Sequence, residues 1–187
     1  MRSIKNYAKT IPLLATLFFL CLPVGARADD IQESLPASIL AHASTPLKET
    51  GKSTFRRFGL RVYVASLWTK DGTWDVNKPY ALALRYTRGV SKDTMVDIVI
   101  GDIRDQNVAD DATLTRWQGI LNQDLPAVAD GDVLVGLAIP GKKSLLFYNG
   151  KQIASLDDAA LSQAFFNVWL GKTADEDMRA ELLGKPE

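Results

Sequence analysis

Two segments with apolar side chains at every second position most strongly limit how this chain can fold. They are Leu60–Trp68 and Tyr80–Arg88. A period of two is that of a β-strand with one face on a core. In the first segment, strict alternation predicts one face with Leu60, Val62, Val64 and Trp68 and another with Arg61, Tyr63, Ala65 and Leu67. A sheet is therefore expected early in the chain, with strands that begin near Thr54 and turn at Gly59.

Apolar side chains follow a helical period in three later segments. Each segment repeats them at intervals of three or four positions, which is the pattern of a helix with one buried face. The stripes are Val96, Val99, Ile100 and Ile103; Leu114, Trp117 and Leu121; and Leu161, Ala164, Phe165, Val168 and Trp169. Ser91 is expected to cap the first helix, and Asp157 or Asp158 the third. A capping box from Thr173 to Glu176 predicts a short last helix.

Further strands are expected between the second and third helical stripes. Val133–Leu137 alternates, and Leu145–Tyr148 is followed by the pair Asn149-Gly150. That pair tolerates the positive φ angles of a two-residue hairpin turn. Strands grouped early and late, with helices between and after them, favour an α+β fold over alternating βαβ units. We expect an antiparallel β-sheet with the helices packed on one face, an open-faced sandwich.

The N-terminus has the three parts of a secretory signal peptide. Three basic residues within the first nine positions precede the apolar run Ile11–Leu22, and Ala26-Arg27-Ala28 is a small-x-small cleavage sequence. The run is shorter than the roughly 20 residues that span a bilayer. We therefore expect residues 1–28 to be removed, which leaves a periplasmic protein without a stable membrane span; an uncleaved membrane anchor is the alternative. Cys21 would leave with this segment, so no disulfide is expected.

Composition places the remainder among ordinary globular proteins. The chain is 47% hydrophobic and 24% charged. Residues 29–46 are interpreted as a polar lead-in and residues 47–187 as a single domain. Without residues 1–28, the chain has 18 basic and 22 acidic side chains, a net charge of −4. This charge argues against nucleic acid as a partner, and nothing in the sequence identifies a protein partner.

Few of the usual catalytic arrangements are possible with these residues. The single histidine, His42, is expected in a solvated loop of the lead-in rather than in a triad or a metal site. No cluster of cysteine and histidine supplies zinc ligands, and no glycine-rich phosphate-binding loop occurs, so neither a metal nor another cofactor is expected. The acid pairs Asp102/Asp105 and Asp110/Asp111 are expected in water near helix ends.

Arginines in the first strands are the strongest candidates for binding chemistry. Arg56 and Arg57 are adjacent, so alternation directs them to opposite faces, and one of them should point to the helix-covered side. A guanidinium there needs an acceptor, and a ligand carboxylate fits its two-pronged geometry. Arg61 is a third candidate. The ordinary alternative is an arginine in solvent whose aliphatic stem covers apolar surface.

Four stretches of the sequence resemble the bacterial chalcone isomerase-like proteins. They are Gly51–Trp68, Pro79–Tyr86, Phe165–Gly171 and Met178–Gly184. The first contains F-R-R-F-G-L-R-V-Y-V-A-S-L-W and the third reads F-F-N-V-W-L-G. The resemblance extends from Leu47 to Gly184. It implies the chalcone isomerase fold, in which a cleft lies between an antiparallel sheet and the helices packed on it.

The resemblance implies either catalysis or fatty-acid binding, because that family contains both. The plant enzymes of the fold close a chalcone to a flavanone with an arginine that stabilises the enolate and with a threonine, a tyrosine and an asparagine. The resemblance places the arginine at Arg56, the threonine at Phe58, the tyrosine and asparagine around Met95 and Asp102, and a late polar position at Val168. Phenylalanine, methionine and valine cannot hydrogen-bond a ketone or a water molecule, so most of the enzymatic set is absent.

The favoured hypothesis is a non-catalytic protein that binds a fatty acid or a similar amphiphilic carboxylate in an apolar cleft. Arg56 would pair with the carboxylate, Tyr63 would donate a hydrogen bond, and Thr54 would be a polar neighbour. One alternative is an intramolecular lyase of the chalcone–flavanone isomerase type that acts on a phenolic enone, with Arg56 as its catalytic residue. Another is a structural or interaction protein whose own side chains fill the cleft.

Overall fold

A six-stranded antiparallel sheet forms the centre of the protein. The computed structural model describes residues 35–141 and 143–185. The strands are β1 (Lys48–Arg57), β2 (Leu60–Thr69), β3 (Tyr80–Tyr86), β4 (Val133–Ala138), β5 (Ser144–Tyr148) and β6 (Lys151–Leu156). Their order in the sheet is their order in the chain. This architecture confirms the antiparallel α+β class predicted from the sequence.

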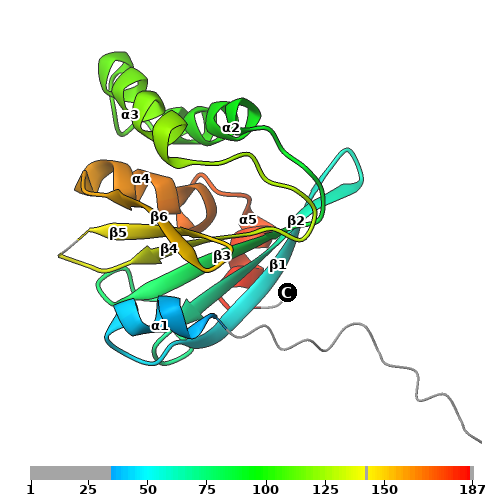
Figure 1. The fold of residues 1–187 in the computed structure, drawn as a ribbon, viewed down its shortest axis with the longest axis vertical. Coiled ribbons are helices and arrows are strands. Elements are labelled where there is room, and N and C mark those ends of the chain that lie inside the picture. The colour runs from blue at the N-terminus through cyan, green and yellow to red at the C-terminus, as the bar shows by residue number, and fades with distance from the viewer. Residues whose placement is uncertain (1–34, 142, 186–187) are drawn as a thin grey trace, which may run out of the picture. The chain divides into compact units, whose positions relative to one another are not determined.

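The helices are arranged mainly on one face of the sheet. They are α1 (Ala37–Ala43), α2 (Lys92–Asp105), α3 (Asp111–Asp124), α4 (Ala159–Leu170) and α5 (Glu176–Leu182). Figure 1 shows α4 next to the sheet, with α2 and α3 beyond it. No helix among the described residues is long and apolar enough to cross a membrane.

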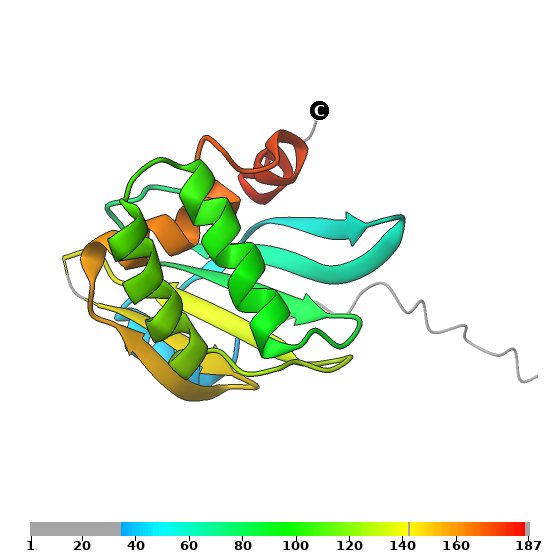
Figure 2. The same cartoon turned by 90° about the horizontal axis from the view of Figure 1, so that it is seen from above.

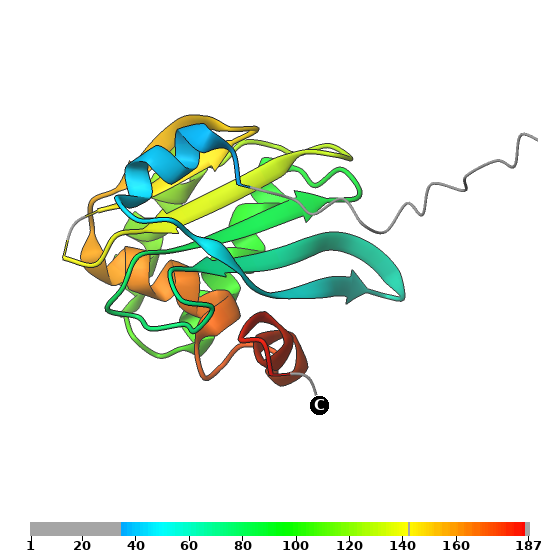
Figure 3. The same cartoon turned by 90° about the horizontal axis from the view of Figure 1, so that it is seen from below.

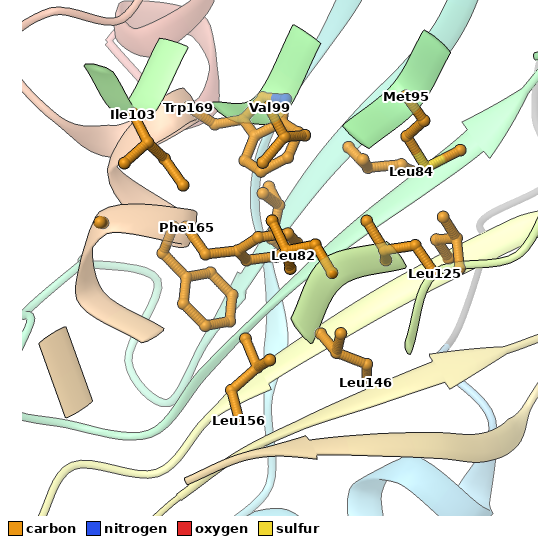
Figure 4. Close-up of a cluster of buried hydrophobic side chains, with 14 of the residues drawn as sticks. Leu82, Leu84, Met95, Val99, Ile103, Leu125, Leu146, Leu156, Phe165 and Trp169 are labelled. Carbon is orange, nitrogen blue, oxygen red and sulfur yellow. The ribbon is translucent and has the colours of Figure 1, made fainter. Parts of the chain in front are cut away.

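The main core lies between the sheet and α2, α3 and α4. Leu82 and Leu84 of β3 face this layer, as does Leu146 of β5. Phe165 and Trp169 of α4 pack against them, and Figure 4 shows these side chains in one cluster. All three helical stripes expected from the sequence contribute to this core, because each presents apolar residues along one side of its helix.

A second, smaller core covers the opposite face of the sheet. Ile39 and Ala43 of α1 are fully buried there, against Trp68 and Phe147 among others. Figure 3 shows α1 lying across this face. The expected polar lead-in therefore contains a packed helix, and the core begins upstream of residue 47. The expected signal peptide, residues 1–28, lies outside the described residues.

Local sequence signals fix most element ends. Ser91 caps α2, with its Oγ accepting from the backbone N of Thr94 at 3.3 Å. Asp158 caps α4, and its Oδ1 accepts from Ala160 N at 2.9 Å. The capping box predicted at Thr173 is wrong, because the side chain of Asp175 caps α5 instead. A carboxylate next to the first turn also interacts favourably with the helix dipole.

The last helix lies along the free edge of β1, as Figure 3 shows. This close approach depends on Gly51. A Cβ at that position would overlap the carbonyl oxygens of Glu181 and Leu182 at the end of α5. Arg179 holds the helix from its other side, with its Nε donating to the carbonyl of Leu170 at 2.8 Å.

If α1 is part of the folded domain, Ile39→Ala should lower the free energy of unfolding by about 2–5 kcal/mol, because it removes a fully buried side chain. Ala41→Gln, at an exposed position of the same helix, should change it by less than about 0.5 kcal/mol. His42 is unsuitable as the control: the expectation that it lies in a solvated loop is wrong, because it is in α1 with its ring centroid 5.6 Å from that of Phe147. Urea denaturation followed by circular dichroism measures both. Equal, small effects of the two substitutions would mean that α1 does not contribute to the core.

Candidate functional site

A β-bulge near the tip of the β1–β2 hairpin decides on which side of the sheet Arg61 lies. Phe55 lies opposite Tyr63, but the next pair is Arg56 and Arg61, so Val62 is an extra residue in β2. Because opposed residues share a face, Arg56 and Arg61 both point away from the helix layer. The prediction that Arg61 shares a face with Tyr63 is therefore wrong.

Arg57 is the arginine of the adjacent pair that faces the helix-covered side. It is two residues from Phe55, which packs on the main core, and it lies opposite Leu60. Alternation along a strand therefore places it on the side of Tyr63. The expectation that one of the two neighbours points inward is met by Arg57 and not by Arg56.

An open cleft of about 600 Å³ lies between this hairpin, α2 and the segment that joins α4 to α5. The hairpin contributes Phe55, Arg57 and Tyr63 to its wall, among others. Ile98 of α2 and Val168 of α4 line it from other sides. A volume in the range of about 300–1,000 Å³ is typical of sites for small molecules.

The inner wall of the cleft separates it from a small internal void. Tyr86, Met95, Val99 and Trp169 line both spaces, and the void has a volume of about 40 Å³. Figure 4 shows Met95, Val99 and Trp169 in one cluster of buried side chains. The other residues around the void are apolar. The apolar surface of the cleft thus adjoins a small unfilled space in the core.

Tyr63 is the best-positioned polar group in the cleft. Its hydroxyl accepts a hydrogen bond from the indole Nε1 of Trp169 at 3.0 Å, and its ring stacks on Phe55 with a centroid distance of 4.9 Å. Burial raises the pKa of Tyr63 well above its ordinary value, and the Trp169 hydrogen bond only partly opposes this. The phenol therefore stays protonated, with its hydrogen available to an acceptor in the cleft.

Charged side chains of both signs surround the mouth of the cleft. Arg57 and Arg88 stand on the side of the sheet, whereas Asp102 and Asp105 project from α2. Burial raises the pKa of Asp102, the neighbouring Asp105 raises it further, and the positive charge of Arg57 lowers it. The head of a ligand would thus meet cations on one wall and carboxylates on the other.

The structure brings only part of the predicted site together. Tyr63 lines the cleft, but Arg56 and Thr54 line a separate depression beside Lys52 and Glu181 at the edge of β1. Their ligand-binding roles stay predictions, and neither residue is in the cleft wall. Four positions assigned through the family resemblance do line the cleft: Phe58, Met95, Asp102 and Val168.

Asp102 and Asp105 are exposed, as expected, and they also form part of the wall of the open cleft. The signal for their position is present in the sequence, because Ile98, Asp102 and Asp105 recur at helical spacing along one side of α2. On α2, an apolar residue is thus followed by acidic residues on the same side of the helix. This pattern indicates that one end of the helix borders a cleft. Among the described residues, no group of histidine, cysteine, aspartate or glutamate is arranged to hold a metal ion.

Comparison with known proteins gives one family and one informative structure. The family model described as chalcone isomerase-like matches residues 32–184. The crystal structure of a fatty-acid binding protein from Arabidopsis thaliana superposes with a TM-score of 0.56, covering 74% of this chain and 87% of that one. The identity is 11%, so this similarity shows a shared fold alone. Among curated proteins, none matches the sequence of this chain.

The pKa of Asp102 leads to a prediction about stability and pH. A raised pKa in the folded state means that folding favours the protonated carboxyl, so the wild type loses stability as pH rises through this pKa. Asp102→Asn should therefore be more stable than the wild type at pH 7, and this advantage should vanish near pH 3. Urea denaturation at both pH values measures the difference.

Asp130→Asn is a suitable control, because Asp130 is exposed and outside the cleft. It should not alter stability at either pH. A destabilised Asp102→Asn variant at pH 7 would instead mean that the attraction between Asp102 and Arg57 outweighs the cost of burial.

Proposed function

Because this chain belongs to the chalcone isomerase-like family, we propose that it is a non-catalytic periplasmic protein that binds a fatty acid or a similar amphiphilic carboxylate. The observation that carries the proposal is a cleft with an apolar interior and two donors, Arg57 and Tyr63, on the same wall. The Arabidopsis protein of the same fold is a fatty-acid binding protein, which supports this class of ligand. The signal-peptide pattern in residues 1–28 is the basis for the location.

The two donors suit a carboxylate head group. Arg57 offers a planar guanidinium that binds two oxygens at once. Tyr63 is held by Trp169 and Phe55, so little side-chain entropy is lost when its hydroxyl donates to the ligand. Asp102 faces them from α2, and its raised pKa reduces the repulsion of an incoming anion as the pH falls.

The apolar interior suits an acyl chain. Each buried methylene contributes about 0.8 kcal/mol, so ten of them supply about 8 kcal/mol, which corresponds to roughly micromolar affinity. Tyr86, Met95, Val99 and Trp169 stand where such a chain would reach the inner wall. Methionine adapts readily to new neighbours, because its side chain is flexible and polarizable.

The side chains at the positions matched to the enzymes favour binding over catalysis. Phe58, Met95 and Val168 line the cleft, and none of them can orient water or polarise a ketone. A rate enhancement for enolate formation depends on donors aimed at the developing charge. Arg57 and Tyr63 are such donors, but three of the four matched positions in the cleft are apolar, and the fourth holds the carboxylate of Asp102.

A matched pair of arginine variants tests the head-group site. Arg57→Ala should weaken the binding of a fluorescent long-chain fatty acid by about tenfold to a hundredfold, because it removes a charge-assisted hydrogen bond worth about 1.5–3 kcal/mol. Arg56→Ala, which removes the same side chain on the other face of β1, should bind as the wild type does. Fluorescence titration measures all three proteins.

The opposite ranking would restore Arg56 as the ligand-binding residue. A wild type that takes up no fatty acid, and from which no lipid can be extracted for mass spectrometry, would refute the proposed function. Loss of naringenin chalcone absorbance faster than in buffer would replace it with the isomerase alternative.

The inner wall gives a second test, based on chain length. Val99→Phe places a larger side chain between the cleft and the void, so it should weaken the binding of hexadecanoic acid more than that of octanoic acid. Isothermal titration with both acids measures the difference. Equal losses for the two acids would mean that the chain does not reach this wall. The variant's own stability should fall by about 1–3 kcal/mol through overpacking.

A further inference from the structure

The tip of the β1–β2 hairpin carries a side chain that its backbone does not favour. Phe58 has a φ of 51° and Gly59 a φ of 74°, so both central residues of the turn have positive φ. The β5–β6 hairpin has the same kind of turn at Asn149 and Gly150, with φ values of 48° and 79°. Asparagine tolerates this conformation well, whereas a bulky aromatic residue rarely adopts it.

Burial does not offset the unfavourable conformation of Phe58. Its side chain is 90% exposed, the largest exposure among the large apolar residues that the structure describes. Leu60 follows at the same tip and is 53% exposed. Figures 1 and 2 show this hairpin extending beyond the other strands of the sheet. A strained and exposed aromatic residue at a projecting tip indicates a role in binding.

The hairpin itself is strongly basic near its tip. Residues 48–69 contain five basic residues and one acid, although the whole chain has 22 of each. The acid, Glu49, pairs with Trp68 at the end of the hairpin that is away from the tip. Arg56, Arg57 and Arg61 flank the two tip residues, and the guanidinium of Arg57 lies 5.6 Å from the ring centroid of Phe58. Arg88 packs beneath the tip, with its Nε donating to the carbonyl of Arg61 at 2.7 Å.

Exposed apolar side chains with arginines beside them are complementary to a lipid surface that carries anionic head groups. Aromatic and aliphatic side chains enter the boundary between head groups and acyl chains, while basic side chains attract anionic head groups. Phe58 and Leu60 also line the mouth of the cleft. A bilayer at this tip would therefore meet the cleft mouth, so that an acyl chain could pass from one apolar environment to the other.

We propose that the tip formed by Arg56, Arg57, Phe58, Leu60 and Arg61 docks on a lipid bilayer that carries anionic head groups. Phe58 and Leu60 enter the bilayer, and the arginines contact the head groups around them. The exchange of a ligand at this position rests on the proposed function, whereas the docking itself does not. A lipid surface is favoured over a protein partner because the apolar point is narrow and the charged residues next to it in the hairpin are all arginines. The acids Asp102 and Asp105 lie on α2, which forms another wall of the cleft.

Vesicle co-sedimentation tests the docking with the full chain. The wild type should bind vesicles of phosphatidylcholine mixed with phosphatidylglycerol more tightly than vesicles of phosphatidylcholine alone, and added salt should weaken this binding. Phe58→Asn should reduce the binding about tenfold or more. The variant should be at least as thermally stable as the wild type, because asparagine fits the turn.

Matched variants separate the tip from the rest of the chain. Val108→Asn removes another exposed apolar side chain, far from the tip in sequence and outside the cleft wall, and should bind vesicles as the wild type does. The double variant Arg56→Glu with Arg61→Glu should lose the preference for anionic vesicles. All of these proteins share the same N-terminal segment, so differences among them report on the substituted positions.

Two outcomes would overturn the docking proposal. One is a Phe58→Asn variant that binds the mixed vesicles as tightly as the wild type does. The other is a wild type that ignores vesicles of both kinds, which would leave a protein partner for this tip.

Fatty-acid titration without vesicles keeps this result apart from the proposed function. The Arg56→Glu, Arg61→Glu variant should keep wild-type fatty-acid affinity, because both side chains lie outside the cleft wall. Loss of vesicle binding together with retained fatty-acid binding supports docking at the tip. A wild type that binds vesicles but no fatty acid would refute the proposed function and leave the docking standing.

Discussion

The pairing of β1 with β2, including the bulge in β2, is the feature on which the arrangement of arginines at the hairpin tip depends. One extra residue, Val62, shifts the pairing so that Phe55 opposes Tyr63 while Arg56 opposes Arg61. A regular ladder would place Arg61 on the side of Tyr63. The bulge instead directs Arg61 outward, to the side of Arg56, whereas alternation along β1 places Arg57 on the helix side. The irregularity thereby adds a second arginine to the outer surface of the hairpin and leaves Arg57 at the cleft.

The mouth of the cleft is more rigid than its inner end. Near the mouth, Tyr63 is fixed by Trp169 and Phe55, and its pKa is raised by burial, so the donor is rigid and neutral. Deeper in, Met95 and Val99 separate the cleft from a small void. The hydrogen-bond donor near the mouth is thus fixed in position, whereas the flexible side chain of Met95 lies between the cleft and the void.

Periodicity and turn chemistry were sufficient to predict most of the fold. The stripes on α2, α3 and α4, the caps at Ser91 and Asp158, and the turn at Asn149 all follow from local rules, because each depends on neighbours within a few residues. The bulge was not predictable in this way, since pairing with β1 decides the register of β2. The packing of α1 was missed for a similar reason: its short apolar side is recognisable only against the back of the sheet.

The contact between α5 and β1 has a consequence for how copies of the protein behave toward one another. The outermost strand of an open sheet presents unpaired amide and carbonyl groups, to which another chain can add as a further strand. Gly51 allows the end of α5 to sit against this border, so the helix obstructs the place where a neighbouring molecule would continue the sheet. A larger residue at position 51 would displace α5 from β1, and other copies of the chain could then add to the exposed strand edge.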